Sequence, residues 1–237
     1  MPLERLDKLI AMGTGLSRSE AQQLIASGAV LLDGVRVSSG KEKADIALNS
    51  IAVNGKELNV KRNIYIMMNK PVGYVCSTDD PQKTVLELVP KELFRKGLFP
   101  AGRLDKYSEG MLIITDDGDF SHRMLSPRKK LPKTYEVEVD SPLTDPKIAE
   151  AFSIGIPIEK GKKTSPAKLE ITSPTSAEVT IYEGMYHQIR RMFDRFRINV
   201  VKLKRIKIGG LLLDETLEAG KCREITKKEL DKIFLIN

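Results

Sequence analysis

Ala101-Gly-Arg-Leu-Asp105-Lys-Tyr-Ser-Glu-Gly110-Met-Leu-Ile-Ile-Thr115 is the stretch that indicates the fold of most of this 237-residue chain. It reads as a turn after Phe99-Pro100, a carboxylate among polar residues, a glycine, and then an uninterrupted apolar strand. An aspartate in such a loop usually forms a turn or caps a helix. A chemical role for Asp105 therefore depends on support from motifs elsewhere in the chain.

Strands and short helices alternate on both sides of this stretch. We expect strands over 64–68, 111–115, 134–139, 167–171, 177–182 and 200–208, and helices over 144–153 and 185–196. Several of these strands follow one another with only turns between them. This pattern predicts an α+β fold with a mainly antiparallel, mixed sheet.

The first 60 residues read as a separate, smaller unit. Apolar residues recur at helical spacing at Leu3, Leu6, Leu9 and Ile10. Ser17 to Glu20 fits a capping box for a second helix, and Gly28 suits its C-terminal left-handed position. Asp33-Gly34 and Asn54-Gly55 are typical of tight hairpin turns. We therefore expect an N-terminal domain over 1–60, a link at 58–63, and a larger domain over 61–237.

The charge of the chain favours a polyanionic partner. The net charge is +7, but residues 1–60 carry seven Lys/Arg and seven Asp/Glu, so the excess lies entirely after residue 60. Residues 121–135 carry basic side chains and no acid, and 190–207 carry eight basic residues against one acid. Such clusters suit phosphate contacts.

Several classes of protein fit poorly. No run of about 18 apolar residues suggests a membrane span, and the charged N-terminus does not read as a secretory signal. Cys76 and Cys222 are far apart and lack metal-ligand spacing, and only two histidines occur. The stretch 116–119 lacks calcium-loop spacing and reads as a turn that caps a helix. We expect a cytoplasmic, monomeric protein with reduced thiols, no metal and no cofactor.

Four motifs occur in the order found in the pseudouridine synthases, a family that the chain resembles. They are Asn69-Lys70-Pro71-x-Gly73-Tyr74, Gly102-Arg-Leu-Asp105, Lys133-Thr134-Tyr135-x-Val137, and Glu183-Gly184-Met-Tyr-His187-Gln188-Ile189-Arg190-Arg191-Met192. Tyr74-Val-Cys-Ser-Thr-Asp-Asp-Pro81, Ser126-Pro-Arg128 and Ile208-Gly-Gly210 resemble members that modify 16S rRNA. Where the family usually has a threonine before the glycine, Ser108 can supply the hydroxyl. Arg5-Leu-Asp-Lys-Leu-Ile, Ser17-Arg-Ser-Glu-Ala and Val30 to Val37 resemble an S4 RNA-binding domain.

This resemblance implies a catalytic trio of Asp105, Tyr135 and Arg190. Asp105 would be the catalytic carboxylate, acting as a nucleophile at C1′ or C6 or as a base at C2′. The uridine must leave its stack to be reached, and Tyr135 would stack on it or move a proton. Arg190, on the helix expected over 185–196, would lie near Asp105 and keep it ionised.

The resemblance also implies that ribosomal RNA, as small-subunit rRNA or an assembly intermediate, is the partner. Candidate RNA-binding residues are Arg5, Lys8, Arg18, Arg36, Arg103, Arg123, Arg128, Lys129, Lys130, Lys133, His187, Gln188 and Arg191. Any one of the charged residues can instead be a solvated surface group. Two other functions remain open: the same reaction on a large-subunit (23S) rRNA uridine, and a non-catalytic S4-type RNA-binding protein. The trio argues against the binder, because a binder needs no pocket carboxylate.

Overall fold

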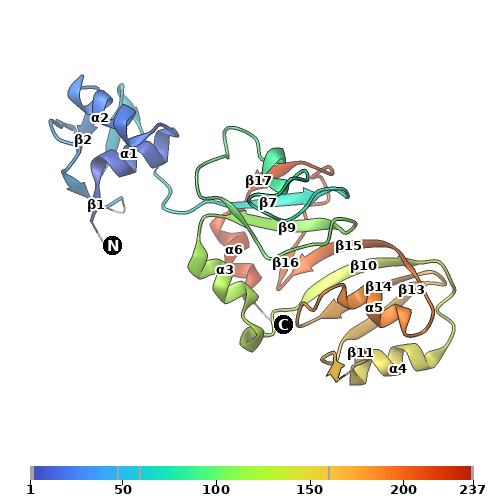
Figure 1. The fold of residues 1–237 in the computed structure, drawn as a ribbon. Coiled ribbons are helices and arrows are strands. Elements are labelled where there is room, and N and C mark those ends of the chain that lie inside the picture. The colour runs from blue at the N-terminus through green and yellow to red at the C-terminus, as the bar shows by residue number, and fades with distance from the viewer. Residues whose placement is uncertain (1–2, 47, 59, 160, 236–237) are drawn as a thin grey trace. The chain divides into compact units, whose positions relative to one another are not determined.

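The computed structural model describes residues 3–46, 48–58, 60–159 and 161–235. The chain forms two compact units, residues 1–64 and 65–237, which are treated separately below (Figure 1). Among the described residues, no helix is both long and apolar enough to cross a lipid bilayer.

Among its described residues, the N-terminal unit contains two helices and two small sheets. The helices are α1 (Leu6–Thr14) and α2 (Arg18–Ala26). The sheets contain β1 (Glu4–Arg5), β2 (Val30–Leu32), β3 (Val35–Arg36), β4 (Lys43–Ala44), β5 (Ile51–Val53) and β6 (Lys56–Glu57), in the orders β1-β4 and β3-β2-β5-β6. The predicted capping box of α2 is confirmed, since Ser17 Oγ accepts from Glu20 N and the Glu20 carboxylate accepts from Ser17 N.

Both predicted tight turns are confirmed by their backbone angles. Asp33-Gly34 and Asn54-Gly55 have φ of 50°, 79°, 51° and 75°, the paired positive values that twist a two-residue hairpin correctly. The expected helical position of Leu3 is wrong. Leu3 is 59% exposed and precedes β1, and α1 starts only at Leu6.

The larger unit is built on a mixed, mainly antiparallel sheet, which confirms the predicted α+β class. Among the described residues nine strands form it, with β13-β14-β10-β15-β9-β7-β17 as its path, β16 paired with β15, and β8 with β9. The strands are β7 (Tyr65–Lys70), β8 (Phe99–Ala101), β9 (Glu109–Thr115), β10 (Lys133–Val139), β13 (Lys168–Ser173), β14 (Ser176–Ile181), β15 (Val200–Ile208), β16 (Leu211–Leu212) and β17 (Cys222–Glu224). Only β9 and β15, in this described sheet, run parallel.

Helices cover the two halves of this sheet. They are α3 (Gly118–Leu125), α4 (Pro146–Ile154), α5 (Gln188–Asp194) and α6 (Lys227–Ile233), with short 3-10 turns η1 (Val85–Leu88) and η2 (Pro127–Lys129). A small hairpin of β11 (Pro157–Glu159) and β12 (Lys162–Lys163) stands beside α4. In Figure 1, α3 and α6 lie by the half containing β9, and α4 and α5 by the half containing β10 and β14. Asp117 caps α3, as predicted, by accepting a hydrogen bond from Phe120 N.

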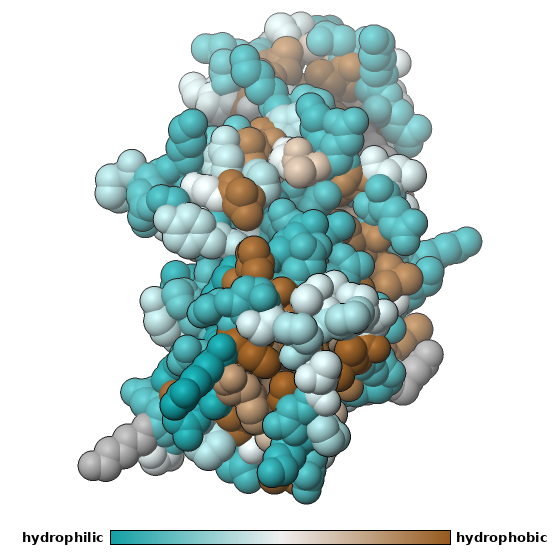
Figure 2. Space-filling model, turned by 90° about the vertical axis from the view of Figure 1, so that its right-hand side faces the viewer, coloured by the Kyte–Doolittle hydropathy of each residue, from teal (hydrophilic) through white to brown (hydrophobic). Residues whose placement is uncertain are grey.

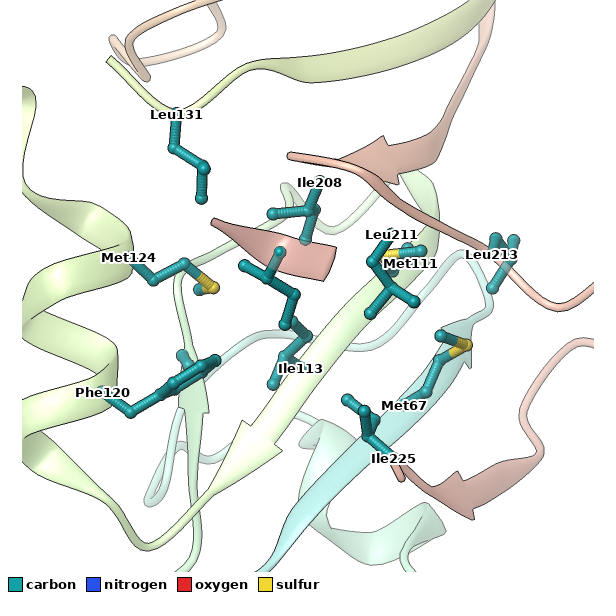
Figure 3. Packing of buried hydrophobic residues seen from close by; sticks show 12 residues of the cluster. Met67, Met111, Ile113, Phe120, Met124, Leu131, Ile208, Leu211, Leu213 and Ile225 are labelled. Atoms are coloured by element: carbon teal, nitrogen blue, oxygen red, sulfur yellow. The ribbon is translucent and has the colours of Figure 1, made fainter. Parts of the chain in front are cut away.

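The core of one half of this unit joins β7, β9, α3, β15, β16 and the C-terminal segment (Figure 3). Met67, Met111 and Ile113 are fully buried there, and Phe120 packs edge-on against Tyr65 and Phe234. On the surface shown in Figure 2, hydrophobic side chains form small groups between hydrophilic ones.

Candidate active site

Asp105 lies in the loop that connects β8 to β9. These two strands pair antiparallel, with Ala101 opposite Ile113, so residues 102–108 must project beyond the sheet. Gly110 starts the buried strand with φ of 97°, next to the point where β15 runs parallel to β9. A Cβ at Gly110 would lie 2.3 Å from the carbonyl oxygen of Arg205, so only glycine fits.

A buried lysine binds the backbone of the Asp105 loop. Lys70 is fully buried at the end of β7, and its ammonium donates to the carbonyl oxygens of Ser108 (2.8 Å), Pro71 (3.0 Å) and Asp105 (3.2 Å). Burial lowers the pKa of this ammonium, while the nearby Cys76 and Asp105 favour its charged form. The sequence showed Lys70 within a motif but did not reveal this anchoring.

A buried arginine joins the start of the same loop to strand β9 that follows it. Arg205, 3% exposed on β15, donates from Nε to Met111 O across 2.7 Å and from Nη1 to Arg103 O across 3.5 Å. Within the described residues no carboxylate pairs with it, and its Nη2 has no hydrogen-bond partner. Its guanidinium carbon lies 6.0 Å from the centre of the Tyr135 ring. In the sequence Arg205 is one of the eight basic residues of 190–207. Its two-residue spacing from Leu203, which places both on the same strand face, was the available signal of its burial.

The carboxylate of Asp105 opens into a cavity of about 300 Å³. Tyr135, 7% exposed on β10, forms part of its wall, and Met185, His187 and Ile189 also line it. The side chain of Asp105 is 35% exposed, and Nε2 of His187 lies 3.6 Å from its Oδ1. The cavity therefore brings Asp105 and Tyr135 together, with an imidazole in place of the expected guanidinium.

Ser108 also lines this cavity and contributes a buried hydroxyl. The residue is 1% exposed, and among the described residues its Oγ has no hydrogen-bond partner. A buried polar group without a partner costs free energy, so this hydroxyl is poised to gain from a polar ligand.

Arg190 lies at the edge of this region, but it does not pair with Asp105 as expected. Its guanidinium donates from Nη1 to Val200 O across 2.7 Å and from Nη2 to Tyr107 O across 3.0 Å. Among the described residues, the basic side chain near the Asp105 carboxylate is that of His187, whose contact at 3.6 Å is an ion pair only when the imidazole is protonated. The expected helix over 185–196 is also shorter at both ends, because α5 spans only Gln188–Asp194.

The loop of residues 182–187 between β14 and α5 is fixed by hydrogen bonds. Gln188, 4% exposed, accepts from Met185 N (2.9 Å) and donates to Glu183 Oε1 (3.0 Å), and Glu183 also accepts from Ser165 N (2.7 Å). Gln188 therefore organises the loop, and its predicted RNA contact stays a prediction. His187 occupies the N-cap position of α5 with left-handed φ of 49°, and its ring stacks on Tyr186 with centroids 3.9 Å apart.

The other candidate RNA-binding residues of this unit differ in how exposed their side chains are to solvent. Exposed basic side chains are those of Arg103, Arg123, Arg128, Lys129 and Lys130. Lys133 is mostly buried, its ammonium donates to Leu131 O, and burial together with the nearby charge of Arg205 lowers its pKa to about 8. Arg191 donates to Ile158 O across 2.7 Å, which anchors α5 to β11.

In the N-terminal unit, a buried aspartate gathers two of the predicted RNA-binding arginines. Asp7 is fully buried and accepts hydrogen bonds from Arg5 (2.6 Å), Arg18 (2.9 Å) and Gln22 (3.0 Å). These donors, Arg5 foremost, hold the pKa of Asp7 well below its usual range. The other two predicted RNA-binding residues of this unit, Lys8 and Arg36, also have partners within the unit.

Those two residues make local contacts within the N-terminal unit. Lys8 pairs with Glu4 across 2.9 Å, and Arg36 donates to Ser27 O across 3.0 Å. Each of the four basic side chains thus has a partner within the unit, and their contacts with RNA stay predictions.

Comparisons with known proteins match both units. Residues 64–195 match the model of the RNA pseudouridylate synthase family, and residues 4–47 match that of the S4 domain. The uncharacterized RNA pseudouridine synthase YtzG of Bacillus subtilis is 42% identical over 231 residues, which cover 95% of this chain and 96% of that protein. Ribosomal small subunit pseudouridine synthase A of Escherichia coli is 42% identical over 232 residues, covering 97% and 99%.

A solved structure gives the same result for the fold. The crystal structure of a pseudouridylate synthase, 39% identical, superposes with a TM-score of 0.69 over 97% of this chain and 99% of that one. The family match includes the loop, strand and helix that carry Asp105, Tyr135 and Arg190. The chain therefore belongs to the RNA pseudouridylate synthase family, as an RNA-modifying isomerase with an N-terminal S4 domain.

Proposed function

We propose that this protein isomerises one uridine of 16S rRNA to pseudouridine, with Asp105 as the catalytic carboxylate. The observation that carries the proposal is the cavity itself. Among its described lining residues Asp105 is the one carboxylate, and Tyr135 and Ser108 share the same walls. A carboxylate in a cavity with an aromatic side chain, and with no second carboxylate among the described lining residues, suits chemistry on a flipped pyrimidine.

The reaction is balanced without an oxidant or reductant. The bond between N1 and C1′ breaks, the uracil turns, and C5 joins C1′. The hydrogen on C5 leaves as a proton, and N1 takes up a proton. Asp105 would begin this sequence either as a nucleophile at C1′ or C6 or as a base that removes the proton from C2′.

The residues around Asp105 have separate tasks in this proposal. Tyr135 would stack against the flipped uracil, and its hydroxyl could move a proton. The Ser108 hydroxyl would gain a polar partner on the nucleotide. Lys70 and Arg205 would fix the loop backbone, because Lys70 binds the carbonyl oxygens of Asp105 and Ser108 and Arg205 binds that of Arg103. A pocket held in this way needs little rearrangement during the reaction.

The choice of 16S rRNA is supported by the relatives named for the small subunit, which align over nearly the full chain. The reaction would take place in the cytoplasm, by a monomer. Mapping of pseudouridines in rRNA from cells with and without the gene tests the substrate. Loss of one 16S site supports the proposal, whereas loss of a 23S site alone would redirect it to the large subunit.

Asp105→Asn tests the catalytic role, because it removes the charge with little change in volume. We expect no tritium release from C5-labelled uridine RNA, with RNA affinity within a few-fold of the unchanged protein. Asp194→Asn is the matched control, since Asp194 is exposed at the end of α5 and should leave the rate unchanged. Substantial turnover by Asp105→Asn would refute the assignment.

A further inference from the structure

Tyr186 is the most exposed aromatic residue among those described, with 74% of its surface accessible. It nevertheless lines the cavity that contains Asp105. Tyr135, in contrast, is 7% exposed within the same cavity. The two tyrosines therefore offer aromatic surfaces at different depths, one within the walls and one open to solvent.

The backbone that carries Tyr186 is held in place. Gln188 donates a hydrogen bond of 3.0 Å to Glu183 and so closes the loop, and Glu183 accepts another from the Ser165 hydroxyl. Gln188 N also donates to Met185 O across 3.1 Å. A large aromatic side chain on such a loop has little conformational entropy left to lose on binding.

His187 supports the ring of Tyr186 and links it to Asp105. The two rings are stacked, with centroids 3.9 Å apart and an angle of 16° between their planes. His187 keeps a left-handed backbone, which is uncommon for a residue other than glycine. Its Nε2 faces Asp105 at 3.6 Å. The stacked pair thus forms one continuous wall from the carboxylate to the solvent.

We propose that the Tyr186–His187 stack is a subsite for a second nucleobase of the RNA, next to the flipped uridine in sequence. The proposal rests on the proposed function of the Asp105 cavity. Flipping a uridine out of its stack leaves the faces of its neighbours uncovered, and an exposed, rigid aromatic ring can cover one of them. Stacking of this kind tolerates any base, so Tyr186 contributes affinity and positioning rather than sequence preference.

The test uses the full chain and an oligoribonucleotide containing a uridine that the unchanged enzyme converts. This choice keeps the test independent of which rRNA supplies the site. Binding is measured in the Asp105→Asn background, so that no turnover occurs. Tyr186→Leu removes the flat ring, Tyr186→Phe keeps it, and Tyr182→Leu is the matched control, because Tyr182 is exposed on the same loop but does not line the cavity.

We expect Tyr186→Leu to weaken binding about five- to a hundredfold, and Tyr186→Phe and Tyr182→Leu to stay within about twofold of the parent. 2-Aminopurine placed on either side of the uridine should be quenched at one position, and Tyr186→Leu should relieve that quenching. An abasic nucleotide at that position should weaken binding by the parent but not further weaken binding by Tyr186→Leu.

Two results would overturn the subsite. One is equal affinity of Tyr186→Leu and Tyr186→Phe. The other is an abasic penalty that remains in full after Tyr186→Leu, which would show that another residue, or no residue, covers the base. Turnover by Asp105→Asn itself would refute the proposed function instead, and it is read from tritium release rather than from binding.

Discussion

Arg190 donates a hydrogen bond of 3.0 Å to the carbonyl oxygen of Tyr107, two residues after Asp105. A second bond, of 2.7 Å, joins the same guanidinium to Val200 O at the start of β15. Arg190 thus connects α5 to both the Asp105 loop and the central sheet. In this structure Arg190 binds the backbone two residues after Asp105, whereas the family resemblance implied that its guanidinium lies near the Asp105 carboxylate.

Arg190→Met should therefore slow the chemical step more than it weakens binding. It removes two hydrogen bonds from a charged donor, each contributing about 1.5–3 kcal/mol. We expect the single-turnover rate to fall at least about tenfold, with RNA affinity within a few-fold. Arg191→Met is the control on the same helix, because Arg191 binds β11 and not the Asp105 loop. Near-normal rates for Arg190→Met would refute the anchoring role.

The exposed lysines after α3 should behave differently from Arg190. Lys129→Ala or Lys130→Ala should weaken RNA binding and reduce the slope of log affinity against log salt by about 1. Their saturating single-turnover rates should stay unchanged. A rate loss without a change in salt slope would show that these residues do not contact phosphate.

Lys70→Met tests the support beneath the Asp105 loop. Its ammonium serves several carbonyl oxygens, and each one left buried without a donor costs about 1–3 kcal/mol. We expect tritium release to show a turnover loss of at least about tenfold. We also expect a lower melting temperature, measured by circular dichroism. Lys106→Met is the matched control, since the Lys106 ammonium binds the exposed Gln82 side chain. Equal effects of the two variants would contradict the specific role of Lys70.

Lys133 makes stability depend on pH in an identifiable window. Its pKa is lowered to about 8 in the folded protein, whereas a lysine in the unfolded chain titrates at about 10.4. Between these values the unfolded chain binds more protons, so the free energy of unfolding should rise with pH across this window. Below pH 8 Lys133 is charged in the folded protein, and burial of this cation lowers the free energy of unfolding.

Lys133→Met should therefore raise the free energy of unfolding at pH 7 by roughly 1–3 kcal/mol. It should also remove most of the rise between pH 8 and 10 in urea unfolding followed by circular dichroism. Lys130→Met, at an exposed position, should change neither. A less stable Lys133→Met protein at pH 7 would mean that the hydrogen bond to Leu131 O outweighs the cost of burial.

Removal of residues 1–60 separates targeting from catalysis. The larger unit has its own sheet and core, and it contains Asp105, Tyr135 and Arg190. Residues 61–237 should fold, show a raised KM on rRNA with a smaller change in single-turnover rate, and select their site less well, because the remaining attraction is mostly to phosphate. Site-resolved pseudouridine mapping measures this. Unchanged selectivity would exclude a targeting role, and an inactive but folded truncation would mean that the S4 domain helps to build the active site.

The sequence by itself determined the two-part organisation, most elements and the position of the loop that carries Asp105. Capping at Ser17, tight turns such as Asn54-Gly55, and the glycine before the apolar strand are local signals, because short-range sterics and hydrogen bonds specify them. The predicted strand over 200–208 coincides with β15. The pattern of apolar and polar residues that predicts a strand is likewise contained within the segment itself.

Only the tertiary structure decided which groups surround Asp105. Lys70, Arg205 and His187 come from β7, β15 and the start of α5, and strand pairing and loop closure bring them together. A basic residue in the sequence looks the same whether it is solvated, like Lys129, or fully buried, like Lys70. The difference arises because burial of a charge is tolerated only where several carbonyl oxygens converge on it, and that convergence exists only in the folded chain.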